Sequence, residues 1–178
     1  MKNNLKKFRP FGPFEIKFEN MPGGKRITRD LLKNFWTTTH ELNNKIRPVK
    51  GVYIFGMKVT STILPCYIGK TNNTFERECF TDRNINIYNG EIIRYARNYK
   101  PFIFFLVYQQ ERKQKISDKV LRELERYLIN LAVEKNSDLA NTRGREDKDR
   151  FDIIEIGGRG RGRGAPTKEG KFYKKMMD

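Results

Sequence analysis

Two tyrosines, two basic residues and one glutamate have the side-chain types that hydrolysis of a phosphodiester requires. Tyr53 and Tyr67 lie in short apolar segments, Lys70 and Arg77 follow Tyr67 three and ten positions later, and Glu125 borders an apolar helical stripe. A phenol can orient or deprotonate water, an arginine binds phosphate oxygens in a fixed fork, and a carboxylate is a hard ligand for Mg²⁺. The set therefore predicts attack of water on a phosphate ester.

Each of these residues also has an ordinary structural interpretation. A tyrosine in a strand is most often part of the core, and Glu125 could pair with Arg122 or Arg126 on a solvated helix face, which is worth about 0.3–0.5 kcal/mol. A free phenol has a pKa of about 10, so a tyrosine base needs a cationic neighbour, for which Lys70 is the candidate. The residues alone do not assign which tyrosine activates the water.

The elements that must position this chemistry are predicted from hydrophobic periodicity. We expect strands at residues 14–18, 51–55, 66–69 and 102–108, because these runs alternate or are continuously apolar. Helices are expected after Thr28, through Glu76, over residues 91–99 and after Ser117, where leucines form one stripe. The fold class is α+β, with a small, mainly antiparallel, three-stranded central sheet flanked by helices and with basic N- and C-terminal extensions.

The ordered set of motifs resembles the GIY-YIG nuclease family over residues 51 to about 141, roughly half of the chain. The resemblance rests on two tyrosine half-motifs followed by an arginine, a glutamate and an asparagine: Gly51-Val52-Tyr53, Tyr67-Ile68-Gly69, Arg77, Glu125 and Asn141. Two departures are visible. Val52 replaces the usual isoleucine, and Phe80 and Thr81 stand where some members carry a histidine after the arginine.

This resemblance implies a magnesium-dependent endonuclease that hydrolyses DNA. It implies Tyr53 as the general base assisted by Lys70, Tyr67 and Arg77 as further catalytic residues, and Glu125 as the Mg²⁺ ligand, with Mn²⁺ as a substitute. Gly69 and Asn141 are assigned to substrate binding. A compact nuclease with basic arms is most similar to a restriction enzyme, so we expect site-specific cleavage of double-stranded DNA by a homodimer. The alternative within the family is a homing or repair nuclease.

The charge of the chain independently favours a polyanionic partner. It has 37 basic and 21 acidic residues, a net charge of +16, and the excess lies mainly at the two ends. We divide the chain into a basic N-terminal extension (1–50) that contains a helix and could contact DNA, a nuclease-like core (51–142) and a C-terminal strand with a Gly/Arg-rich tail (143–178). Arg159, Arg161 and Arg163 in this tail are expected to contact phosphates. A nucleic-acid-binding protein without catalysis is the alternative from another class.

Composition excludes several other classes of protein. No apolar run approaches the roughly 20 residues that cross a bilayer, so no membrane partner is expected, and residues 1–10 lack the apolar stretch of a signal peptide. Cys66 and Cys79 make no disulfide framework, and His40 is the single histidine, so a zinc site with several Cys and His ligands cannot be built. We therefore expect a cytoplasmic location.

Overall fold

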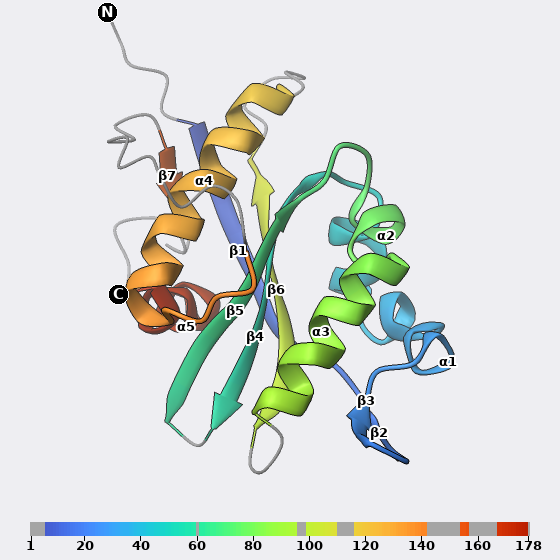
Figure 1. Ribbon diagram of the computed structural model, residues 1–178. Helices are drawn as coiled ribbons and strands as arrows, with labels where there is room; N and C mark the ends of the chain where they lie inside the picture. The colour runs from blue at the N-terminus through green and yellow to red at the C-terminus, as the bar shows by residue number, and fades with distance from the viewer. Residues whose placement is uncertain are drawn as a thin grey trace, which may run out of the picture.

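A five-stranded sheet lies between two layers of helices in the computed structural model (Figure 1), which describes residues 6–59, 61–95, 99–109, 116–141, 154–156 and 167–177. The strands lie in the order β5-β4-β6-β1-β7. All neighbouring strands are antiparallel except β1 and β7, which are parallel. Their bounds are β1 Lys6–Glu15, β4 Gly51–Val59, β5 Thr62–Lys70, β6 Lys100–Tyr108 and β7 Ile154–Ile156. A separate hairpin pairs β2 (Glu19–Met21) with β3 (Gly24–Arg26).

Helices cover both faces of the sheet. One face carries α1 (Arg29–Leu32), the short helical turns η1 (Phe35–Thr37) and η2 (Leu42–Ile46), α2 (Phe75–Glu78) and α3 (Asp82–Arg94). The other face carries α4 (Asp118–Lys135) and α5 (Lys168–Met177) (Figure 1). The prediction of an α+β protein with a largely antiparallel sheet flanked by helices is confirmed.

Alternation along β4 explains the two hydrophobic cores. Tyr53 and Phe55 belong to the cluster that packs under α3, whereas Val52 and Ile54 belong to the cluster that packs under α4. Successive side chains of a strand point to opposite faces, so a central strand covered on both faces is apolar at every position. The same reason accounts for the continuous apolar run of β6, which was predicted at residues 102–108 and spans Lys100–Tyr108.

The leucine stripe of α4 was also predicted. Ser117 caps the helix by accepting a hydrogen bond from the backbone N–H of Val120 at 3.4 Å, and Leu121, Leu124 and Leu128 are fully buried against the sheet. Leucines spaced three and four residues apart lie on one helix face, so the opposite face of α4 is left to charged residues. Glu125 lies at the border between the two faces.

The prediction for the helix before β6 was wrong in its bounds. We expected residues 91–99, but α3 begins at Asp82 and ends at Arg94. The hydroxyl oxygen of Thr81 accepts a hydrogen bond from the Asn84 N–H at 3.4 Å, and Ile85, Tyr88 and Ile92 provide the buried face. Asn86 and Asn89 lie between these residues and hid the periodicity, although Thr81 is an ordinary N-cap.

The N-terminal segment contributes a strand that was predicted elsewhere. The strand expected at residues 14–18 is instead β1, Lys6–Glu15, which pairs with β6 over its length. Phe8 and Phe11 are buried in the two opposite cores. The three expected strands are the adjacent β5, β4 and β6, and β1 and β7 extend the sheet beyond them. Trp36, on η1, packs in the core.

Candidate active site

The pairing of β4 with β5 brings both tyrosines of the motif to the α3 face of the sheet. Tyr53 lies opposite Gly69, and Phe55 lies opposite Tyr67. Because a register shift follows Phe55, Cys66 has no paired residue on β4. The Tyr53 and Tyr67 ring centroids are 6.3 Å apart. Tyr53 is buried, with 2% of its surface exposed, and Tyr67 is partly exposed.

Gly69 has a steric role in this arrangement. A Cβ atom at position 69 would overlap the ring and hydroxyl of Tyr53. The absence of a side chain therefore lets the Tyr53 ring lie directly over the neighbouring strand. Gly69 was assigned to substrate binding, which stays a prediction, whereas its close packing against Tyr53 is a feature of the fold.

The Tyr53 hydroxyl is held by an asparagine that the sequence did not single out. Asn84, in the first turn of α3, donates from Nδ2 to the Tyr53 hydroxyl oxygen at 2.8 Å and to the Glu78 carbonyl at 2.8 Å. Burial raises the pKa of Tyr53 well above its ordinary value, as do the nearby Cys79, Tyr67 and Glu125, while the hydrogen bond from Asn84 lowers it. Tyr53 is therefore a neutral phenol deep in the site.

Tyr67 lies nearer to solvent and has a cationic neighbour. Burial raises the pKa of Tyr67, the charge of Arg83 lowers it, the charge of Glu125 raises it, and hydrogen bonding from Tyr53 lowers it. Its ring also makes an edge contact with Tyr88 of α3, with centroids 6.1 Å apart. The cation that acts on a motif tyrosine is thus Arg83, next to Asn84 in the first turn of α3.

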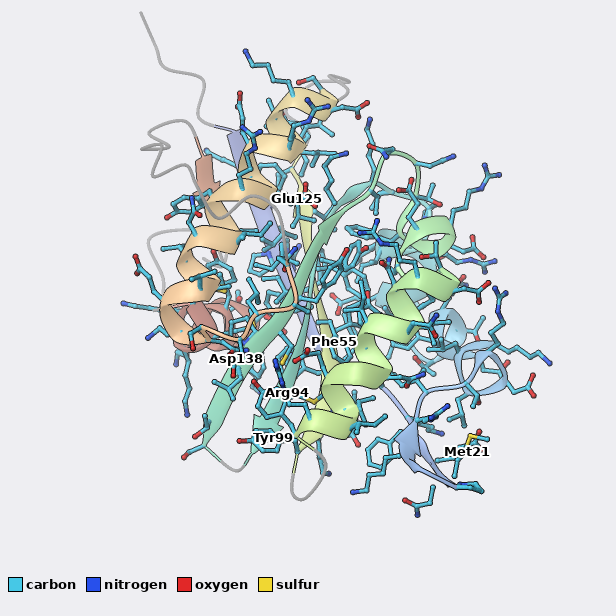
Figure 2. All side chains as sticks on the ribbon, in the orientation of Figure 1. Met21, Phe55, Arg94, Tyr99, Glu125 and Asp138 are labelled. Atoms are coloured by element: carbon cyan, nitrogen blue, oxygen red, sulfur yellow. The ribbon has the colours of Figure 1, made fainter. Side chains whose placement is uncertain are left out.

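Glu125 joins the middle of α4 to the end of β5. Its Oε1 accepts a hydrogen bond from the Lys70 backbone N–H at 3.0 Å, and Figure 2 shows it in the region between α4 and the strands. Burial raises the pKa of Glu125, while the Lys70 N–H and the charges of Lys70, Arg122 and Arg126 lower it. Since the charge of Glu125 acts on both Tyr53 and Tyr67, these three groups form one electrostatic unit.

Lys70 and Arg77 point to other neighbours. The Lys70 ammonium donates to Asn72 Oδ1. Burial raises the pKa of Glu125, and the charge of Lys70 lowers it. A hydrogen bond from Lys50 lowers the pKa of Asp118, and the charge of Lys70 adds to this effect. Arg77 is exposed on α2. The charge of Lys70 thus acts on the Glu125 carboxylate and is not among the influences on the pKa of Tyr53 or Tyr67. The catalytic roles of Lys70 and Arg77 stay predictions.

Asn141 binds the backbone of β5. Its Oδ1 accepts from the Ile68 N–H and its Nδ2 donates to the Ile68 carbonyl, both at 2.8 Å. The neighbouring Ala140 N–H donates to the Cys66 carbonyl at 2.8 Å, and Asn136 Nδ2 donates to the Pro65 carbonyl at 2.9 Å. Residues 136–141 thus form hydrogen bonds with backbone groups on the outer edge of β5, which would otherwise remain unpaired.

Part of the predicted site lies outside the described residues. This holds for Arg159, Arg161 and Arg163, so their assignment to phosphate binding stays a prediction. The predicted residues that the structure brings together are Tyr53, Tyr67, Gly69, Lys70, Glu125 and Asn141, all at or beside the last half of β5. Sequence reasoning missed Arg83 and Asn84, for which the N-cap at Thr81 was the available signal.

The donor set at Glu125 fits a cation that needs few protein ligands. In the described part of the chain, no group of three or more His, Cys, Asp or Glu side chains is placed to hold a metal ion. Mg²⁺ keeps most of its water shell and is commonly bound by one or two carboxylates together with substrate phosphates. A single carboxylate held by the Lys70 N–H at the end of a strand is compatible with such binding.

Comparisons with protein-family models, with curated proteins and with solved structures found no match to this chain. No helix within the described residues combines the length and the apolar character needed to cross a membrane. The functional interpretation therefore rests on the geometry of the site, on the charge of the chain and on the motif resemblance.

Proposed function

We propose that this chain is a magnesium-dependent DNA endonuclease of the GIY-YIG type that hydrolyses phosphodiester bonds. The convergence of two phenols and one carboxylate at the end of β5 carries this proposal. Tyr53 and Tyr67 lie side by side, and the charge of Glu125 acts on both hydroxyls. Phenol, carboxylate and arginine together supply the groups that water activation and phosphate binding need.

The two tyrosines have different roles in this proposal. Tyr53 is 2% exposed and its hydroxyl is bound by Asn84, so it is poorly placed to meet a water molecule from solvent. Tyr67 is partly exposed and lies within the field of Arg83. We assign Tyr67 to orient and deprotonate the attacking water and Tyr53 to support the Tyr67 oxygen, whereas the family resemblance implies Tyr53 as the base.

Glu125 would hold the cation. A bound Mg²⁺ supplies positive charge to the phosphate oxygens and lowers the pKa of its coordinated water. Ionised Glu125 is needed for this binding, and because burial raises its pKa, the cations Lys70, Arg122 and Arg126 matter for keeping it ionised. Mn²⁺, which has similar oxygen ligands, is expected to substitute.

Cations lie on two sides of the site, where we expect the substrate phosphates to bind. Arg83 lies on the α3 side next to Tyr67, while Arg122 and Arg126 lie on α4 next to Glu125. Arginine is well suited to this task because its planar fork pairs with phosphate oxygens in a bidentate way. These residues would bind phosphates of a DNA strand that crosses the end of β5. Arg77 and the tail arginines would make further phosphate contacts.

Within the family we favour a restriction-type enzyme in the cytoplasm that cuts double-stranded DNA at specific sites as a homodimer. This finer proposal rests on the basic segments that flank residues 51–142, and homing or repair nucleases are the alternatives. Sequencing the ends of cleaved plasmid distinguishes them. Discrete ends with a symmetric recognition sequence support the restriction type, whereas scattered ends contradict it.

The second candidate function is nucleic-acid binding without catalysis, which the net charge of +16 alone would favour. Incubating the purified chain with plasmid DNA at several salt concentrations, with Mg²⁺ or with a chelator, separates the two functions. We expect magnesium-dependent cleavage of duplex DNA in preference to duplex RNA. A gel shift without any cleavage would instead support the binding protein.

A further inference from the structure

The first turn of α3 places a buried amide against the oxygen of Tyr53. Asn84 is 6% exposed, and its Nδ2 donates to Tyr53 and to the Glu78 carbonyl, with the Cys79 carbonyl 3.4 Å away. Placing a buried polar side chain among three oxygens is favourable only when it can donate to them. The surroundings of this side chain therefore favour a hydrogen-bond donor such as an amide nitrogen.

The two carbonyls fix the orientation of this amide. A carbonyl oxygen only accepts hydrogen bonds, so the group that faces Glu78 and Cys79 must be the NH₂ of Asn84 and not its oxygen. The Tyr53 oxygen then acts as an acceptor from Asn84. Its own proton remains for another partner, and the adjacent phenol on β5 is that of Tyr67, whose ring centroid lies 6.3 Å from that of Tyr53.

We propose that Asn84 is a positioning residue of the active site: by donating to the Tyr53 oxygen it directs the Tyr53 hydroxyl toward Tyr67, so that Tyr53 donates to the oxygen that activates water. Hydrogen bonds in such a chain polarise one another, so a donor to Tyr53 makes Tyr53 a better donor to Tyr67. The side chain of Asn84 contacts Tyr53 and the carbonyls of Glu78 and Cys79, so it would act on the reaction through two phenols. The assignment of Tyr67 as the activating group rests on the proposed function, whereas the hydrogen-bond chain itself does not.

Several other groups also act on these phenols and must be considered in any titration. Cys79, Tyr67 and Glu125 face Tyr53 from the segment after α2, from β5 and from α4. Arg83 of α3 and Glu125 face Tyr67. Tyr88 of α3 lies against Tyr67 and donates its hydroxyl to the Cys79 carbonyl at 2.9 Å. After burial, the neighbouring Tyr53 also raises the pKa of Tyr88. Asn84→Ala leaves all of these side chains in place.

The chain offers a matched control on the same helix. Asn89 of α3 also bridges backbone groups with its side chain, accepting from the Ile27 N–H at 2.7 Å and donating to the Ile27 carbonyl at 3.1 Å. It ties α3 to the segment after β3. Asn89→Ala therefore removes a comparable structural link and leaves the contacts of Tyr53 unchanged.

The test uses the full chain with a fluorinated tyrosine at position 67, whose phenol ionises near neutral pH, and follows its ionisation by ¹⁹F NMR without DNA. We expect the ionisation midpoint to rise in Asn84→Ala and in Tyr53→Phe, and to stay unchanged in Asn89→Ala. In the double variant, the ionisation midpoint should equal that of Tyr53→Phe alone, because Asn84 acts on position 67 only through the Tyr53 hydroxyl. Unchanged midpoints in Asn84→Ala, or equal shifts in Asn84→Ala and Asn89→Ala, would overturn the proposal.

Cleavage of duplex DNA supplies a second measurement. With the natural Tyr67, Asn84→Ala should slow magnesium-dependent cleavage at neutral pH by about 3–10-fold, the worth of one net hydrogen bond, without changing DNA affinity. If Asn84→Ala does not fold, Tyr53→Phe carries the test, and an unshifted Tyr67 midpoint in that variant overturns the proposal. If the natural chain cuts no DNA while the ¹⁹F midpoints shift as expected, the proposed function fails and the hydrogen-bond chain stands.

Discussion

The Oε1 atom of Glu125 accepts a hydrogen bond from the backbone N–H of Lys70 at 3.0 Å. This contact ties the middle of α4 to the last residue of β5, so the position of the carboxylate is set by the edge of the sheet rather than by a mobile loop. It also places the carboxylate close enough to Tyr53 and Tyr67 for its charge to raise the pKa of both, after the effect of burial. The candidate metal ligand and the phenols are therefore coupled through the fold.

Two glycines should respond to alanine in opposite directions. Gly69→Ala would push a methyl group into the Tyr53 ring, and we expect the free energy of unfolding to fall by about 1–3 kcal/mol, as for overpacking. Gly90, within α3, has open space around it, so Gly90→Ala should raise the free energy of unfolding by about 0.5–1 kcal/mol. Denaturant unfolding of both variants checks this, and a neutral Gly69→Ala would show that Tyr53 does not pack as described.

Arg83 is expected to contribute to cleavage. Its charge acts on Tyr67, and in the first turn of α3 it adjoins Asn84, which binds Tyr53. Arg83→Ala should slow single-turnover cleavage of saturating DNA by roughly 10²-fold, the typical loss for one donor to a developing oxyanion. Arg83→Lys should recover part of this loss because it keeps the charge without the fork. A cleavage rate equal to that of the natural chain would show that Arg83 has no role in cleavage.

Arg77→Ala should slow the reaction by a similar 10²–10³-fold according to the motif resemblance. Measuring both arginine variants on the same substrate therefore separates the residue that the motif implies from the residue that the fold places near Tyr67.

Because of Glu91, the free energy of unfolding should decrease as the pH rises. It is 7% exposed and its Oε2 has no hydrogen-bond partner among the described residues. Burial raises the pKa of Glu91, the charge of Arg94 opposes this, and the charge of Asp138 adds to it. Figure 2 shows Arg94 and Asp138 close together, and Arg94 donates to the Asp138 carbonyl at 2.9 Å.

The sign of this effect follows from linkage. The folded state holds the Glu91 proton at pH values where the unfolded chain has lost it, so stability falls as pH rises from the ordinary glutamate range through the raised folded pKa. Glu91→Gln removes this loss. Denaturant unfolding at pH 4 and at pH 7 should show a larger gain for Glu91→Gln at pH 7, and an equal difference at the two pH values would contradict the account.

The sequence predicted those elements whose pattern is local. The apolar run of β6 and the leucine stripe of α4 are both present, and α5 packs against β6 beside them. In α5, Phe172 stacks on Phe104 of β6 with ring centroids 5.7 Å apart. Each of these segments carries its own periodicity, so no distant partner is needed to recognise it.

The parts that escaped prediction depend on distant partners. β1 contains Pro10, Gly12 and Pro13, which break the alternation, and it forms a strand because β6 lies beside it. Asn84 is 31 positions from Tyr53 in the sequence, and no local pattern could reveal their hydrogen bond. The motif resemblance located the tyrosines and Glu125, whereas the first turn of α3 became part of the site only when the fold was known.

The most direct test of the central claim compares Glu125→Gln with Glu134→Gln on duplex DNA in the presence of Mg²⁺. Both glutamates lie on α4, but Glu134 is exposed and lies more than two helical turns further along the helix than Glu125. We predict that Glu125→Gln abolishes cleavage and still binds DNA with the affinity of the natural chain, while Glu134→Gln cleaves normally. Cleavage by Glu125→Gln at the rate of the natural chain would contradict the account.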